Sequence, residues 1–105
     1  MTDIDILVVA LNENRTVSFM YDDKPRTVEI HAIGYSTKDD SPIMRGFQVD
    51  GESSRPTPCW ALFTISKIED LAIDDQQSFA PRDGYKLNDK QMSGIIAQVE
   101  MEPVL

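Results

Sequence analysis

The sequence predicts a small, mainly β protein of the α+β kind, in which a five-stranded antiparallel barrel carries a helix at each end. Three observations lead to this prediction. Between residues 16 and 73, apolar and polar residues alternate with the period of two that a half-buried strand requires. Clusters of turn-forming Asp, Gly, Ser and Pro separate these runs. Near both ends of the chain, apolar residues instead recur at helical spacing.

Length and composition indicate one domain over residues 1–105, large enough for a single core. The single cysteine, Cys59, cannot form an internal disulfide, so we read it as a small buried side chain in a reducing compartment. No apolar run approaches the roughly 20 residues of a membrane span. The N-terminus is acidic where a secretory signal is basic. We therefore expect a cytoplasmic protein with no membrane association.

The first element is a helix within residues 1–14. Thr2 is placed to cap it, and Asp3 and Asp5 fall in the first turn, where the helix dipole favours acidic side chains. The β-branched content of this segment favours a strand, but the capping and the spacing agree on a helix. The spacing is that of one apolar stripe, formed by Ile4, Leu7, Val8 and Leu11.

The barrel is expected within residues 16–73. The first two strands form a hairpin around an acidic turn, and a long loop rich in Ser and Pro precedes the fourth strand. That fourth strand is apolar on both sides at its start, so we interpret it as a central strand rather than an edge. The five predicted strands cover residues 16–21, 26–33, 43–49, 59–65 and 70–73.

The end of the chain divides into two parts. Residues 74–87 are expected to be irregular, with Phe79 and Tyr85 as anchors to the core. Residues 88–100 are expected to form the second helix, capped by Asn88, although Gly94 weakens it by about 1 kcal/mol relative to Ala. The apolar stripe of this helix comprises Met92, Ile95, Ile96 and Val99.

Catalysis is not expected. His31 is the only imidazole, and it alternates onto the same strand face as Glu29, where a structural hydrogen bond is the simpler interpretation. The sequence has no Cys/His set with zinc spacing, no glycine-rich phosphate loop and no Gly-x-Ser-x-Gly motif. We therefore predict neither an enzymatic activity nor a bound metal or cofactor.

Part of the chain resembles the WYL domain, over roughly residues 4–79. The motifs that carry the resemblance are Val17-x-Phe19-x-Tyr21, Arg26-x-Val28-Glu29 and Phe63-x-x-x-Lys67-Ile68. The resemblance implies a five-stranded barrel of the Sm-like or SH3-like type. It also implies a regulatory or ligand-binding role, because WYL domains are typically such modules of bacterial and phage proteins.

This chain departs from the family pattern at two places. The Trp-Tyr-Leu that names the family falls on Pro-Ile-Met at residues 42–44, and the arginine often found two residues before the family's Phe is Ala61. Lys67 keeps the basic character of the family's proposed ligand surface. A closer resemblance, over nearly the whole chain, is to small stand-alone bacterial proteins of the same type. It includes RTVEIHAIG at 26–34, MRGFQ-x-x-G-x-S at 44–53, W-x-LF at 60–63, PR-x-GY at 81–85 and DK-x-M at 89–92.

The binding hypothesis rests on three basic residues in or near strands. Arg26, Arg45 and Lys67 are proposed to converge on a small anionic ligand, a nucleotide or single-stranded nucleic acid. Trp60 would offer a stacking surface, and the remaining candidate ligand-binding residues are His31, Gln48 and Ser53. The simpler alternative is that each cation pairs with a carboxylate and Trp60 fills the core.

The formal net charge is −8, from 18 acidic and 10 basic residues, and it opposes binding to nucleic acid through a general basic surface. The competing hypothesis is a protein–protein interaction module that docks through one of the two helical stripes. A monomer and a homodimer both remain open. No helix-turn-helix segment precedes the domain, so we expect the protein to act on a partner or as a stand-alone sensor.

Overall fold

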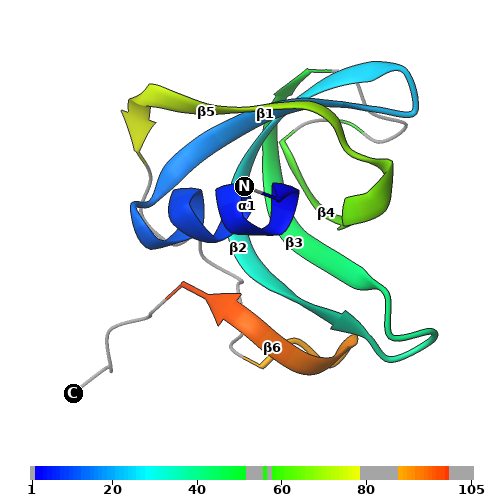
Figure 1. Cartoon of the computed structure of the whole chain (residues 1–105). Helices are drawn as coiled ribbons and strands as arrows, with labels where there is room; N and C mark the ends of the chain where they lie inside the picture. The colour runs from blue at the N-terminus through cyan, green and yellow to red at the C-terminus, as the bar shows by residue number, and fades with distance from the viewer. Residues whose placement is uncertain (1, 52–55, 57, 79–87, 100–105) are drawn as a thin grey trace.

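The computed structural model describes residues 2–51, 56, 58–78 and 88–99. Within these residues one helix and six strands form a curled antiparallel sheet with the helix packed against it (Figure 1). The mainly β, antiparallel class predicted from the alternation is confirmed. The elements are α1 (Asp3–Asn12), β1 (Arg15–Tyr21), β2 (Lys24–Ser36), β3 (Pro42–Gly51), β4 (Cys59–Thr64), the 3₁₀ helix η1 (Ile65–Lys67), β5 (Glu69–Ser78) and β6 (Met92–Gln98).

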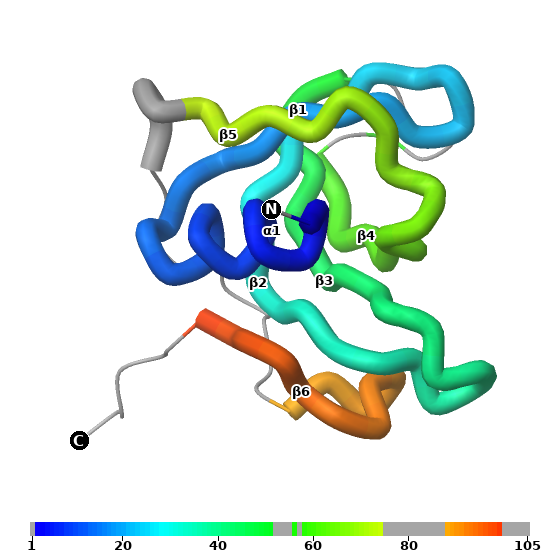
Figure 2. The backbone as a smooth tube through the Cα atoms, viewed as in Figure 1, coloured from blue at the N-terminus to red at the C-terminus, as the bar shows by residue number. Residues whose placement is uncertain are grey.

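The long strand β2 is the axis of the sheet. One of its edges pairs with β3, and the other pairs first with β1 and then with β6. The rest of the order is β4-β3-β2-β1-β5, and the tube in Figure 2 shows how strongly this sheet curls. Eight of the nine residues from Arg26 to Gly34 are buried, which is the pattern of a strand covered on both faces.

The exchange of partners on β2 occurs at a β-bulge. Ile30 lies opposite Gly46 of β3 and Ala32 lies opposite Arg45, so His31 is the extra residue. A bulge bends its strand and increases the local twist. The first half of β2 therefore follows β1, while the second half turns away and receives β6.

The core lies on the concave face of the curled sheet. Phe63 of β4 meets the rings of Phe19 and Tyr21 of β1 edge-on, with ring centroids 5.1 and 5.0 Å apart. This contact joins β4, at one end of the sheet order, to β1, which lies next to the other end. The core also contains Leu7, Leu11, Val17, Val28, Ile30, Ile33 and Met44.

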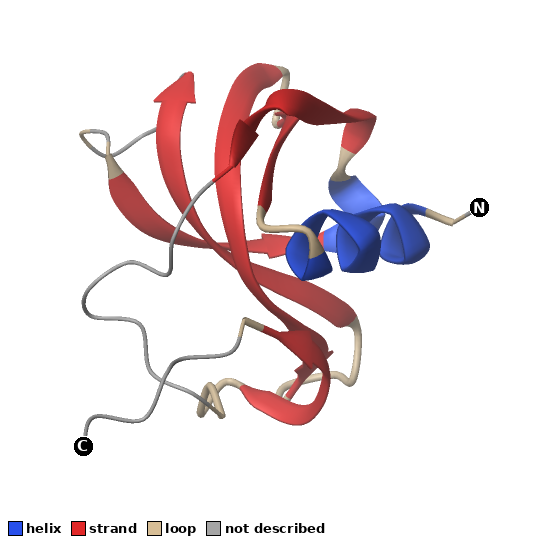
Figure 3. Ribbon diagram, turned by 90° about the vertical axis from the view of Figure 1, so that its left-hand side faces the viewer, coloured by secondary structure: helices blue, strands red, loops and turns tan. Residues whose placement is uncertain are grey.

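Helix α1 begins where the sequence predicts. The Thr2 hydroxyl accepts a hydrogen bond from the Asp5 N–H, and the Asp5 carboxylate accepts one from the Thr2 N–H, which completes a capping box. Leu7, Ala10 and Leu11 turn toward the core, and Figure 3 shows the helix beside the curled sheet. Among the described residues, no helix is both long and apolar enough to cross a membrane.

The predicted C-terminal helix over residues 88–100 is wrong, because Met92–Gln98 form strand β6. β6 pairs with the second half of β2, where Tyr35 faces Gly94. A Cβ on Gly34 would stand 2.4 Å from the Gly94 carbonyl oxygen, so the strands approach more closely than a side chain at Gly34 would allow. The apolar spacing of this segment fits a helix and a bulged strand equally, and the free edge of β2 selects the strand.

Two further expectations about the sheet are corrected. Within the described residues β4 pairs only with β3, so it is an edge strand rather than a central one, and the sheet is not closed between β4 and β5. The fifth strand runs from Glu69 to Ser78, so residues 74–78 are strand and not irregular. The expectations for residues 79–87, including Phe79 and Tyr85, lie outside the described residues.

Tyr21 links β1 to the end of β4 across the curled sheet. Its hydroxyl accepts a hydrogen bond of 3.1 Å from the Thr64 N–H at the end of β4. We expect Tyr21→Phe to lower the free energy of unfolding by about 1 kcal/mol, because the ring contacts remain and one hydrogen bond is lost. Urea denaturation measures this change. Tyr35→Phe is the control, because Tyr35 is exposed and should change stability by less than about 0.5 kcal/mol.

Candidate functional site

Arg26 and Gln48 form a buried polar cluster at one end of the core. Arg26 lies on β2 opposite Phe19, and Gln48 lies on β3 opposite Val28 of β2. The Arg26 Nη1 donates to the Gln48 Oε1 at 3.2 Å, and its Nη2 donates to the Tyr21 carbonyl oxygen at 3.4 Å. Only 8% of Arg26 is exposed, and Gln48 is fully buried.

Two aromatic rings face the Arg26 guanidinium. Its central carbon lies 5.6 Å from the ring centroid of Tyr21 and 5.8 Å from that of Phe63. Contacts of this kind attract a cation to the ring face. The Gln48 amide is itself held by a hydrogen bond of 3.2 Å from its Nε2 to the Asp50 carbonyl oxygen. These contacts surround the Arg26 guanidinium with two hydrogen-bond acceptors and two aromatic rings.

The Arg26 guanidinium has no acidic partner among the described residues. Arg45 forms an ion pair with Asp89, whereas Arg26 forms none with a described carboxylate. The Arg26 Nε is buried and has no hydrogen-bond partner. Of five guanidinium N–H donors, the two hydrogen bonds above engage only two. A buried charge that is not neutralised costs several kcal/mol, so this residue is held in the fold at a cost in stability.

His31 and Trp60 meet on the opposite face of the sheet. Their ring centroids are 4.8 Å apart, and Trp60 also meets Phe47 at 5.2 Å. The His31 Nδ1–H donates to the Glu29 carbonyl oxygen at 2.9 Å, while the His31 carbonyl oxygen accepts from the Val99 N–H. His31 is fully buried at the bulge of β2. These contacts support a structural role for this histidine.

Arg45 lies on the same face as Phe47 and pairs with Asp89, with its Nε 2.8 Å from the carboxylate. The two side chains are 22% and 11% exposed. Burial raises the pKa of the Asp89 carboxyl, but the hydrogen bond from Arg45, the Gln91 N–H and the positive charge of Arg45 together outweigh it, so the pKa lies below its usual value. The alternative of a cation paired with a carboxylate therefore applies to Arg45.

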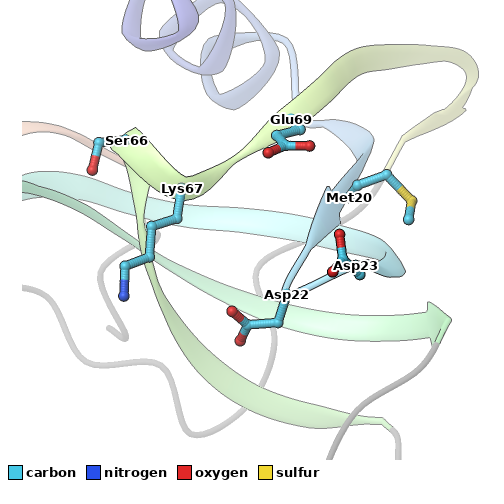
Figure 4. Close-up of a pocket in the computed structure, with 6 residues that line it drawn as sticks. All are labelled: Met20, Asp22, Asp23, Ser66, Lys67 and Glu69. Atoms are coloured by element: carbon cyan, nitrogen blue, oxygen red, sulfur yellow. The ribbon is translucent and has the colours of Figure 1, made fainter.

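Lys67 is exposed and lies at a hollow between η1, the start of β5 and the β1–β2 turn (Figure 4). The hollow has a volume of about 370 Å³. Three carboxylates and one amine line it, so its charge is negative. The lining residues are Met20, Asp22, Asp23, Ser66, Lys67 and Glu69. No three His, Cys, Asp or Glu side chains in the described ranges come together as a metal site.

The candidate residues thus fall into separate places. The structure brings Arg26 together with Gln48, and His31 together with Trp60, but the three cations do not share one face. Arg26 points into the core, and Arg45 lies on the other side of the sheet. Ser53 lies outside the described residues. Sequence reasoning missed Tyr21, Phe63 and Asp89 as partners of these arginines, although the alternation of β1 places Tyr21 on the core face beside Arg26.

No protein-family model matches the chain, and no curated protein matches it. Among solved structures, it is similar to proteasome accessory factor B/C (PafBC) of Arthrobacter aurescens, with a TM-score of 0.64 and 17% sequence identity over 81% of this chain. The similarity spans 13% of the length of PafBC. At this identity the likeness concerns the fold alone, and it supports a WYL-like fold for this chain.

The Arg45–Asp89 pair predicts a loss of stability in acid. The pKa of Asp89 is lower in the folded protein than its unfolded value of about 3.9. The ion pair therefore contributes its full stabilisation above the unfolded pKa, and this stabilisation is lost as the pH falls through the folded pKa. The difference in unfolding free energy between wild type and Asp89→Asn should therefore be constant from about pH 5 to pH 7 and shrink below about pH 4.

Denaturant titrations at a series of pH values measure this difference. Arg45→Gln serves as the second variant, since it removes the hydrogen bond and the charge that lower the pKa of Asp89. Its difference in unfolding free energy from wild type should likewise shrink below about pH 4. A difference that stays unchanged down to about pH 2 would show that the pair does not act in this way.

Proposed function

We propose that this chain is a non-enzymatic regulatory module of WYL type that binds a small anionic ligand through Arg26. The observation that carries the proposal is the Arg26 guanidinium, which is nine-tenths buried, has no carboxylate partner among the described residues and leaves its Nε without a hydrogen bond. An anion that reached it would supply the missing charge and the missing acceptor. The WYL-like fold supports the same general role.

The chemistry of the guanidinium favours a ligand with two neighbouring oxygens. Arg presents N–H donors in a planar fork that matches a carboxylate or a phosphate. Because Arg26 is only 8% exposed, the fork becomes available when the side chain turns outward. That movement exchanges the hydrogen bonds to Gln48 and Tyr21, of 3.2 and 3.4 Å, for shorter charge-assisted ones to the ligand.

A small anion fits the described surface better than a strand of nucleic acid. A strand requires a row of cations along a groove and aromatic rings on the same side. Here Arg45 is paired with Asp89, Lys67 stands among three carboxylates, and Trp60 lies on the face opposite Arg26. The net charge of −8 adds a general repulsion of phosphate backbones.

The buried position of His31 supports binding rather than catalysis. It is the only imidazole of the chain, it is fully buried, and its Nδ1–H is engaged by a backbone carbonyl. A general base must reach the proton that it removes.

If Arg26 is kept for binding, removing its charge should not harm the fold. We expect Arg26→Met to leave the free energy of unfolding unchanged or to raise it by about 1–4 kcal/mol, because a similar apolar volume replaces an uncompensated charge. Urea denaturation at pH 7 measures the change. Phe63→Ala, which removes the ring on the other side of the cluster, should lower stability by about 3–5 kcal/mol. A loss above about 2 kcal/mol in Arg26→Met would contradict the proposal.

Ligand binding is tested by the midpoint of thermal unfolding in phosphate, acetate and a nucleoside monophosphate, with sodium chloride used to hold ionic strength constant. A ligand that binds the folded state raises the midpoint with its concentration. We expect at least one of these anions to raise it in wild type, and Arg26→Met to abolish the effect. Arg26→Lys should weaken binding about tenfold or more, because the charge remains but the fork is lost.

Arg45→Met is the matched control, because it removes a cation on the other face of the sheet and should leave the ligand effect in place. A single-stranded oligonucleotide measured at two salt concentrations distinguishes the nucleic-acid alternative. Anion stabilisation that persists in Arg26→Met, or its absence in wild type for all three anions, would overturn the proposal.

A further inference from the structure

The edge of β4 carries unpaired backbone groups. β4 pairs with β3 from Cys59 to Thr64, and no described strand lies along its other side. The Thr64 N–H points away from β3, since it donates to the Tyr21 hydroxyl. In an antiparallel ladder every second residue points the same way, so the N–H and C=O of Leu62 also face outward. Neither group has a hydrogen-bond partner among the described residues.

The two ends of the sheet differ in how they are protected. Edge strands commonly carry charged residues or prolines, which discourage pairing with another chain. β5 begins with Glu69 and Asp70 and continues to Asp74, so acidic residues mark that edge. β4 reads Cys-Trp-Ala-Leu-Phe-Thr and has neither a charge nor a proline. At its end, the Tyr21 hydroxyl takes the place of a neighbouring strand's carbonyl oxygen.

The negative charge beside the β4 edge indicates which kind of segment could bind along it. β4 runs directly into η1, and Ser66 and Lys67 of η1 line the acidic hollow together with Asp22, Asp23 and Glu69 (Figure 4). A strand added along β4 and continued past Thr64 reaches this hollow, where three carboxylates outnumber one amine. A basic side chain complements that charge. A second copy of this chain would instead bring another net charge of −8.

We propose that the β4 edge accepts an extended segment of a partner protein as an added antiparallel strand. The Leu62 N–H and C=O pair with the backbone of that segment, and a basic residue near its N-terminus enters the hollow between Asp22, Asp23 and Glu69. Backbone pairing supplies affinity in such strand addition, and side-chain sites supply specificity. This proposal rests on the β4 edge and the acidic hollow and not on the Arg26 ligand.

The test uses the full chain labelled with ¹⁵N and the blocked peptide Lys-Lys-Thr-Val-Thr-Val. We expect the peptide to shift the amide signal of Leu62 and to slow hydrogen exchange of that amide about tenfold or more. The same peptide with two glutamates in place of the lysines should bind about tenfold more weakly, because it meets like charges. A version with proline in place of each valine should not bind, since it lacks the N–H groups of a paired strand.

Two variants locate the site. Leu62→Pro removes an N–H that points away from β3, so it costs no hydrogen bond to β3 and should abolish binding. Asp22→Asn with Asp23→Asn leaves β4 untouched and should remove the preference for lysine over glutamate. No shift at Leu62 with the lysine peptide overturns the proposal. So does a shift at Leu62 that appears when the protein alone is concentrated, because the occupant is then a second copy.

Discussion

The arrangement of the molecule depends on the bulge at His31 in the middle of β2. Up to Glu29 the strand pairs with β1, and from Ala32 onward it pairs with β6. His31 holds the junction on both sides, because its ring contacts Trp60 and donates to Glu29 while its carbonyl oxygen accepts from Val99. The extra residue bends β2 away from β1, which begins at Arg15, and the half of β2 that follows pairs with β6. A buried histidine is thus explained by topology.

The periodicity of the sequence predicts which side of a strand faces the core, but not which strand it pairs with. The alternation in β1 to β4 assigns residues such as Phe19 and Phe63 to the core face, and the capping pattern at Thr2 locates α1. The stripe from Met92 to Val99 has a spacing that both a helix and a bulged strand satisfy, and only the open edge of β2 decides between them. The position of β4 at an edge is likewise a property of the whole sheet, which local alternation does not contain.

The same limit explains which part of the site could be predicted. A basic residue in a strand is visible in the sequence, but whether it points into the core or outward depends on register. Arg26 lies opposite Phe19 and joins the core face, whereas Arg45 lies opposite Leu62 on the other face and meets Asp89. One shift of register would exchange these environments. The sequence therefore identifies the cations, and the pairing of β2 with β1 and β3 decides that Arg26 alone is buried without an acid among the described residues.

Tyr21 connects the two surfaces proposed for binding. Its carbonyl oxygen accepts a hydrogen bond from Arg26, its ring faces the guanidinium, and its hydroxyl holds the Thr64 N–H at the end of β4. An outward turn of Arg26 releases the first contact and weakens the second, while a strand added along β4 competes with the third. Because one residue makes all three contacts at the β1–β2 turn, the arginine and the β4 edge are not mechanically separate.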